Sequence, residues 1–140
     1  MGNISRAIGK TAEYLAMYDI ASQGYECFEI GGNMCFDLGL VQNGDVHKIQ
    51  VKSTSKKRTK NCYQFRICRS TRKIKNSKLS YQEKNYNVFD FDILALVFMP
   101  LKKVVYIPFN CVASQKYMNL TGEEEFSIEQ CLEILRETKE

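Results

Sequence analysis

Two runs of alternating apolar and polar residues, on either side of a tight-turn signal, constrain the fold of this chain more than any other feature. Residues 36–40 alternate with period two, residues 49–52 do so again, and Asn43-Gly44-Asp45 lies between them. Such alternation is typical of half-buried strands, and an Asn-Gly pair between two such runs favours a hairpin. The segment 35–53 is therefore predicted to form two paired strands whose apolar residues share one face.

The other face of this hairpin would carry a carboxylate, an amide and an ammonium group, from Asp37, Gln50 and Lys52. A carboxylate and a neutral oxygen suit a hard divalent cation. A lysine beside them can orient or help deprotonate a water molecule, or offset charge on a transferring phosphoryl group. Together the three residues predict metal-assisted cleavage of a phosphodiester bond. The alternative interpretation is an exposed polar hairpin face with no chemistry.

A helical pattern precedes the hairpin. Apolar residues recur at helical spacing between about Arg6 and Ser22, Ser5 is of a type favoured at an N-cap, and Gly24 is placed to end the helix. Glu13 lies at the border of the apolar stripe, from where its carboxylate can reach over a sheet edge toward the hairpin. From the helix alone, a metal-binding role and an ordinary surface position for Glu13 both stay open.

Asp37, the Gln50-Val51-Lys52 triplet after a hairpin, and Glu13 in an upstream helix resemble the PD-(D/E)XK nuclease superfamily, with Gln-X-Lys in place of the usual Glu-X-Lys. The resemblance is greatest to the homing endonucleases of group I introns, among which Gln is a known replacement for the acid, and to the archaeal Holliday-junction resolvases. It covers most of the chain. The further matching segments are Gly24-Tyr25, Phe91-Asp92-Ile93-Leu94-Ala95 and Tyr106-Ile107-Pro108.

This resemblance implies a single restriction-endonuclease-like α/β domain over residues 1–140, with a central mixed sheet of about five or six strands flanked by helices. Asp37 would bind Mg²⁺ or Mn²⁺, and Gln50 would contribute an oxygen or hold a metal-bound water. Glu13 would supply further negative charge at the metal, and Lys52 would position the nucleophilic water. The implied activity is that of a Mg²⁺-dependent DNA endonuclease.

Three more specific functions fit these residues. The narrower prediction is a site-specific homing endonuclease, because the signature carries Gln50. A Holliday-junction resolvase or a restriction-like nuclease would use the same chemistry on another DNA shape. A catalytically inactive DNA-binding module is the third alternative, which the loss of the acid at Gln50 favours.

Charge is distributed unevenly along the chain. The net charge is only +4, yet the segment 48–78 contains twelve Lys or Arg and no Asp or Glu. A basic segment beside a candidate metal site is typical of a protein that binds a polyanion, although a solvated lysine-rich loop is the simpler alternative. The predicted DNA-binding residues are Lys56, Lys57, Arg58, Lys60, Gln64, Arg66, Arg69, Arg72, Lys73, Lys75 and Lys78.

The remaining pattern supplies further elements. Residues 63–67 alternate as a strand, while residues 70–84 show little apolar patterning and could form a surface loop or a short helix. Residues 93–99 are continuously apolar, which is typical of a strand covered on both faces, and residues 104–107 return beside it. Ser127 and Gln130 fit a capping box at the start of a C-terminal helix.

The sequence also limits the partners and the compartment. The six cysteines include no Cys-X-X-Cys pair and are interpreted as buried thiols, and the single histidine, His47, alternates onto the core face of its strand. Neither a membrane span nor a signal peptide is evident, so a cytoplasmic protein, nucleoid-associated or of organellar or phage origin, is expected. Cutting both strands of DNA needs two active centres, so we expect a homodimer or a dimer of dimers on double-stranded or branched DNA.

Overall fold

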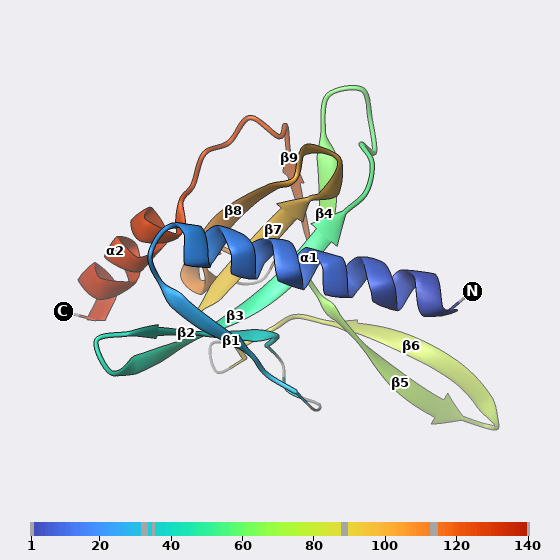
Figure 1. Cartoon of the computed structure of the whole chain (residues 1–140). Helices are drawn as coiled ribbons and strands as arrows, with labels where there is room; N and C mark the ends of the chain where they lie inside the picture. Colours follow the sequence, from blue (N-terminus) through green and yellow to red (C-terminus); the bar gives the residue numbers. More distant parts are fainter. Residues whose placement is uncertain (1, 32–33, 35, 88–89, 113–114, 140) are drawn as a thin grey trace.

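The computed structural model of the chain describes residues 2–31, 34, 36–87, 90–112 and 115–139, and for residues 2–3, 5, 69–73, 81–83 and 139 it describes the backbone alone. A five-stranded mixed sheet in the order β1-β2-β3-β7-β8 forms its centre (Figure 1). The elements are α1 (Gly2–Ser22), β1 (Glu26–Glu29), β2 (Leu38–Gln42), β3 (Asp45–Thr54), β4 (Tyr63–Arg66), β5 (Arg69–Lys75), β6 (Lys78–Lys84), β7 (Ile93–Phe98), η1 (Met99–Leu101), β8 (Lys103–Pro108), η2 (Phe109–Cys111), β9 (Tyr117–Leu120) and α2 (Ile128–Lys139).

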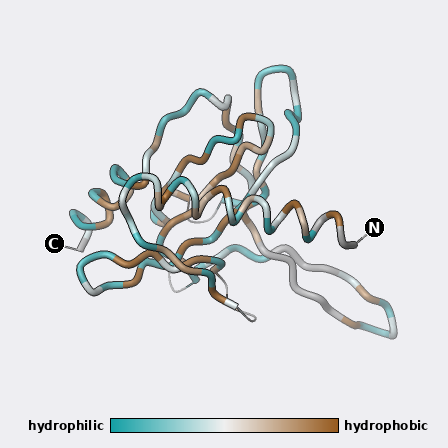
Figure 2. Tube along the Cα trace, viewed as in Figure 1, coloured by the Kyte–Doolittle hydropathy of each residue, from teal (hydrophilic) through white to brown (hydrophobic). Residues whose placement is uncertain are grey.

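Strand β7 is the middle of the core, and all six of its residues are buried. On one face of the sheet, Ala95 packs with Ala16 of α1 and Leu132 of α2. On the other face, Leu96 packs with Phe65 of β4. Figure 2 shows the hydrophobic residues concentrated in these central strands. The predicted strand with two covered faces is confirmed, and the five-stranded mixed sheet with its two helices agrees with the predicted α/β class.

The β2–β3 hairpin is also confirmed. Its strands pair antiparallel, with Leu38 opposite Ile49. Asn43 and Gly44 have φ of 51° and 83°, the left-handed geometry that a two-residue hairpin turn requires. Asp45 was expected within the turn, but it is the first residue of β3 and pairs with Gln42.

Helix α1 is longer than predicted. It begins at Gly2 rather than near Arg6, so Ser5 lies inside the helix and is not its N-cap. Serine is only mildly unfavourable in a helix interior, and no proline interrupts the first turns, so the helix extends back through this position. The other end is as predicted, because Gly24 has φ of 92° and its amide donates to the Ala21 carbonyl at 3.0 Å.

Two pairs of strands lie outside the central sheet. The predicted strand at residues 63–67 exists, but β4 pairs with β9, which the sequence pattern did not indicate, and the two cover the sheet face opposite the helices. Residues 70–84 form neither a loop nor a short helix, since β5 and β6 pair as a hairpin. Within the described part of the chain, no helix is long and apolar enough to cross a membrane.

The cysteines are only partly as predicted. All those that the structure describes are free thiols, and Cys68 and Cys131 are buried. Cys27 and Cys62 are partly exposed, however, and Cys111 is exposed. Cys35 lies outside the described residues. His47 is buried, as its place in the alternation predicted.

Candidate active site

Asp37 stands immediately before β2, where main-chain pairing fixes its position. Its amide donates to the Ile49 carbonyl at 2.8 Å. Its carboxylate oxygen Oδ2 accepts two hydrogen bonds, from the Val51 amide at 2.9 Å and from Gln50 Nε2 at 2.9 Å. A carboxylate held by two donors on a rigid strand has little rotational freedom. The side chain is therefore held in one orientation, and the second oxygen, Oδ1, is not used in these two bonds.

Gln50 and Lys52 lie on the same face of β3. Parallel pairing sets Gln50 beside Leu94 and Lys52 beside Leu96 of β7, and these leucines belong to the core on the side away from the helices. Val51, between them, faces α1. Gln50 is only 9% exposed, and its bond to Asp37 is partly buried. This register sets Gln50 and Lys52 on one face of β3, and Asp37, which precedes β2, reaches Gln50 through the side-chain bond to Nε2.

Glu13 approaches Asp37 from α1, on the other side of the hairpin. Partial burial raises the pKa of the Glu13 carboxyl, and the negative charge of Asp37 raises it further. Lys10 opposes this shift through an ion pair, with its Nζ 3.3 Å from Glu13 Oε2. Lys10 also contacts Glu29 Oε1 at 3.1 Å. Two carboxylates that repel each other in a half-buried place create a local negative potential suited to a cation.

A cleft of about 530 Å³ brings these groups together. Glu13, Asp37 and Gln50 all line it, along with Lys10 and Arg6 from α1. Lys52 is not among its lining residues. Three of the four predicted catalytic residues therefore meet in one cleft. The fourth, Lys52, lies farther along β3 on the same face of the strand as Gln50.

Lys52 is held against an aromatic ring. Its Nζ lies 5.4 Å from the centroid of the Tyr86 ring, within the range of a cation–π contact. Tyr86 follows β6 and packs edge-on against Phe91 at 5.1 Å. Sequence reasoning missed Tyr86 and Lys10. Lys10 lies three residues before Glu13, so helical spacing could have indicated that pair, whereas no local pattern connects Tyr86 with Lys52.

The donors in the cleft fit a hard divalent ion. Glu13 and Asp37 offer carboxylate oxygens and Gln50 offers an amide, although in this structure the amide nitrogen faces Asp37. No group of three or more His, Cys, Asp or Glu side chains could hold a metal in the part of the chain that the structure describes. Mg²⁺ is usually held by one or two carboxylates together with waters and substrate phosphates rather than by a cage made only of protein. Two carboxylates and one amide are consistent with that pattern.

The predicted DNA-binding residues fall on three segments. In the loop after β3, Lys57 Nζ lies 5.7 Å from the Tyr63 ring centroid, and Arg58 Nη1 donates to Gln64 Oε1. Arg66 is exposed at the end of β4. Also exposed are Lys56 and Lys60 in the loop and Lys75 and Lys78 at the tip of the β5–β6 hairpin. Arg69, Arg72 and Lys73 lie on β5, where the backbone alone is described.

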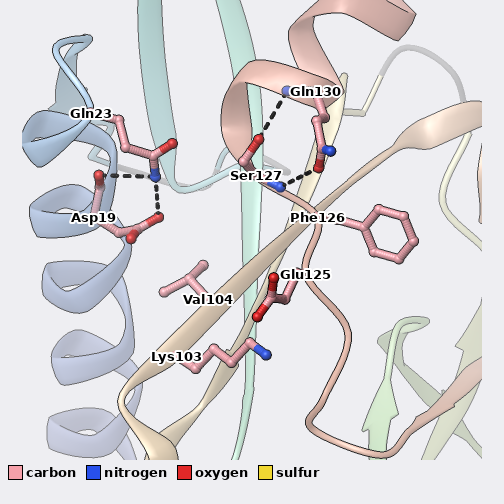
Figure 3. Close-up of a pocket in the computed structure, with 8 residues that line it drawn as sticks. All are labelled: Asp19, Gln23, Lys103, Val104, Glu125, Phe126, Ser127 and Gln130. Carbon is pink, nitrogen blue, oxygen red and sulfur yellow. Dashed lines mark hydrogen bonds between the residues drawn. The ribbon is translucent and has the colours of Figure 1, made fainter.

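A second cavity, of about 370 Å³, lies between α1, β8 and the start of α2 (Figure 3). Its polar groups are largely engaged in structural bonds. Asp19 accepts from the Tyr106 hydroxyl at 2.6 Å and from Gln23 Nε2 at 2.9 Å. Ser127 and Gln130 exchange two side-chain-to-amide bonds, which confirms the predicted capping box. This cavity contains none of the predicted catalytic residues.

Comparison with known proteins agrees with this geometry. Residues 4–137 match the sequence profile of the PD-(D/E)XK endonuclease family. The chain belongs to that family. The fold is also similar to that of a bacterial homing endonuclease, I-Ssp6803I, at a TM-score of 0.68 and 17% identity, covering 94% of this chain and 94% of that one. No curated protein matches the sequence. The predicted superfamily is thus confirmed, and at 17% identity the structural neighbour adds evidence for the fold alone.

Glu13→Gln is expected to raise the thermal unfolding midpoint of the metal-free protein at neutral pH. The pKa of Glu13 is raised in the folded chain, so the unfolded chain releases this proton at a lower pH than the folded chain does. Wild-type stability therefore falls as the pH rises from about 4, the ordinary glutamate pKa, through the higher folded value. Neutral glutamine avoids this loss.

The measurement is a set of melting curves in chelator between pH 4 and 7.5. The gain from Glu13→Gln should be smallest at pH 4 and grow toward pH 7.5. Glu26→Gln, at an exposed position of β1, removes the same charge and controls for the change in net charge. An unfolding midpoint of Glu13→Gln below that of the wild type at pH 7.5 would contradict a raised pKa of Glu13 in the folded chain.

Proposed function

We propose that this chain is a metal-dependent DNA endonuclease and, more narrowly, a site-specific homing endonuclease. The observation that carries the proposal is the shared cleft of Glu13, Asp37 and Gln50, with Lys52 on the same sheet face as Gln50. PD-(D/E)XK nucleases generally use divalent metal ions. The name of the structural neighbour, a bacterial homing endonuclease, supports the narrower assignment.

In this proposal Asp37 and Glu13 bind Mg²⁺ or Mn²⁺ through their carboxylates, and Gln50 is the third residue of the metal site. The bound ion would stabilise charge that develops on the phosphoryl group. The Val51 amide holds the Asp37 carboxylate in place through its bond to Oδ2. Gln50 can either present its oxygen to the ion or hold a water beside it, since an amide can rotate to exchange its two ends.

Lys52 has a separate role. Its ammonium group carries three hydrogen-bond donors, and it lies beyond Gln50 on a strand that cannot move independently of the sheet. We assign it to orienting the attacking water and to offsetting negative charge on the phosphate. The contact with the Tyr86 ring restricts the long side chain, so less conformational entropy is lost when it engages the substrate.

The experiment that tests this function is a cleavage assay on defined DNA shapes. Linear genomic duplex and a synthetic four-way junction are incubated with the protein in Mg²⁺, in Ca²⁺ and in chelator, and the ends are mapped by sequencing. We expect cuts in Mg²⁺ at a few positions of the linear duplex. Cutting confined to the junction would identify a resolvase instead. Binding without any cutting in Mg²⁺ or Mn²⁺ would identify an inactive DNA-binding module.

We further propose that the active form is a homodimer or a dimer of dimers, since the described part of one chain brings Glu13, Asp37 and Gln50 together in a single cleft and a duplex has two strands to cut. The outer side of α1 supports association, because large apolar side chains are exposed there on one side of the helix. These side chains are Ile4, Ile8, Tyr14 and Tyr18. Sedimentation of the protein on duplex DNA should give two or four chains per DNA, and monomers at micromolar concentration would contradict the proposal.

A further inference from the structure

The hairpin of β5 and β6 is a ribbon that extends away from the rest of the domain (Figure 1). Each strand has seven residues, and strands of that size are about 23 Å long at ~3.3 Å per residue. At the tip, Asn76 and Ser77 have φ of 53° and 61°, which is the geometry of a tight hairpin turn that follows the natural strand twist. Among the described strands, β5 and β6 pair only with each other.

The described side chains of this ribbon contribute nothing to the two buried clusters of the core. Residues 74–80 are exposed, and the cross-strand pair Ile74 and Leu79 is 76% and 50% exposed. A two-stranded hairpin without a covering layer is at best marginally stable in water. Within the described part of the chain, no other helix or strand packs extensively against it. A projecting ribbon that adds so little to the core is more readily explained by binding.

The two faces of the ribbon differ in composition. Antiparallel pairing places one set of basic residues on a single face, which we call the basic face: Arg69, Lys73, Lys75, Lys78 and Lys84. The same face takes the polar residues Thr71, Ser80 and Gln82, and no acidic residue. The only acidic residue of the two strands, Glu83, is on the opposite face, opposite Ser70. Five of the six basic residues of the two strands therefore share the basic face, and the sixth, Arg72, lies opposite Tyr81 on the other face.

We propose that the β5–β6 ribbon enters the major groove of the DNA duplex with its basic face toward the bases and selects the sequence that is cut. The major groove, about 12 Å wide, admits a two-stranded ribbon, whereas the minor groove, about 6 Å wide, does not. Arginine and lysine recognise guanine through O6 and N7 in that groove, and glutamine recognises adenine. This inference rests on the proposed function and adds the element that reads the target.

The base of the ribbon is connected to the candidate active site. Tyr86 lies two residues beyond the end of β6 at Lys84, and its ring is the one that Lys52 Nζ approaches at 5.4 Å. Tyr86 is itself fixed by edge-on packing against Phe91. A ribbon seated in the groove would therefore hold the scissile phosphate at a constant offset from the bases it reads. Tyr86 is a positioning residue in this scheme.

The test compares two double variants that remove equal charge. Lys75→Ser with Lys78→Ser alters the basic face at its tip, and Lys102→Asn with Arg136→Gln removes two exposed charges elsewhere on the surface. Each is measured on a duplex that the wild type cuts, in Ca²⁺, by methylation interference at guanine N7, an atom of the major groove. The wild type and the Lys102/Arg136 variant should show the same interfering guanines.

The Lys75/Lys78 variant should lose interference at a subset of these guanines and bind this duplex at least about tenfold more weakly. In a selection from randomised DNA it should accept a wider range of sequences. An unchanged interference pattern, with affinity lowered equally on all sequences, would overturn the groove assignment and leave only phosphate contacts. If the wild type cuts no duplex at all, the proposed function fails. If it cuts and the ribbon variant keeps the pattern, only this inference fails.

Replacing Tyr86 tests whether the ribbon holds the scissile phosphate at a constant distance from the bases that it reads. Tyr86→Ala removes the ring beneath Lys52, whereas Tyr86→Phe keeps it. We expect Tyr86→Ala to spread the cut over neighbouring phosphates on one target, and Tyr86→Phe to cut where the wild type does. A general loss of packing would lower the rate of cutting without moving its position. A single unchanged cut position in folded Tyr86→Ala would therefore contradict the positioning role.

Discussion

Lys52→Ala is expected to reduce the rate of DNA cleavage about 10²–10³-fold, the usual effect of removing one group that stabilises charge in a transition state. DNA affinity should change by no more than about threefold, because in the proposed complex it would come from many phosphate contacts spread along the basic segment. The measurement pairs single-turnover cleavage in Mg²⁺, at saturating protein, with equilibrium binding to the same duplex in Ca²⁺. A loss in cleavage rate without a loss in affinity would place Lys52 at the reaction itself.

Lys48→Ala is the matched control. Lys48 lies on the same strand and the same face, four residues before Lys52, and its Nζ is also near a ring, 5.8 Å from the centroid of Phe36. The variant removes the same charge and the same kind of aromatic contact. We expect its cleavage rate to stay within about threefold of the wild type, the same limit as for affinity. Equal losses in both variants would mean that Lys52 acts only through net charge.

The parts of the fold that the sequence predicted are those with a local cause. The β2–β3 hairpin follows from period-two alternation around Asn43-Gly44, and both of its causes lie within a few residues. Strand β7 follows from an unbroken apolar run, which only a doubly covered strand can bury. Leu38 pairs with Ile49 in the hairpin, so the neighbouring residues Asp37 and Gln50 lie close together. This part of the candidate site could therefore be predicted from the local sequence.

The parts that the sequence did not predict depend on contacts distant in the chain. Strand β9 is exposed at alternate positions and is a strand because β4 pairs with it. The described side chains of the β5–β6 ribbon, residues 74–80 and Lys84, are all exposed, so no apolar period identifies it. Tyr86 reaches Lys52 across thirty-four residues of sequence through the packing of Phe91. Hydrophobic periodicity indicates which face of an element is buried. It therefore cannot identify an element whose side chains are exposed.

Asp37→Asn is expected to abolish cleavage, at least about 10³-fold, by removing one of the two carboxylates that would bind the metal; this corresponds to about 4 kcal/mol of transition-state stabilisation. The fold should survive. The Asn oxygen can still accept from the Val51 amide and from Gln50 Nε2, which both bond to Oδ2 in the wild type. The amide nitrogen then occupies the place of Oδ1 and repels a cation.

Three measurements on Asp37→Asn separate these effects. The rise in unfolding midpoint that Mg²⁺ or Mn²⁺ produces in the wild type should disappear, while the midpoint in chelator should not fall. Asp45→Asn, at an exposed position beside the hairpin turn, makes the same chemical change and should keep both the metal response and cleavage. A folded Asp37→Asn protein that cuts DNA within about tenfold of the wild-type rate, a change worth only about 1.4 kcal/mol, would remove Asp37 from the active site.

The double variant Glu13→Gln with Asp37→Asn tests whether the two carboxylates act as one site. Each single substitution removes the same repulsion, which contributes to the raised pKa of Glu13. In chelator the gains in unfolding free energy should therefore be less than additive, since the second substitution has no repulsion left to relieve. Additive gains would mean that the carboxylates do not interact, and a shared cation site would then have no electrostatic basis. With sub-additive gains and the loss of the metal response in both single variants, the proposed cation site would rest on measured coupling as well as on geometry.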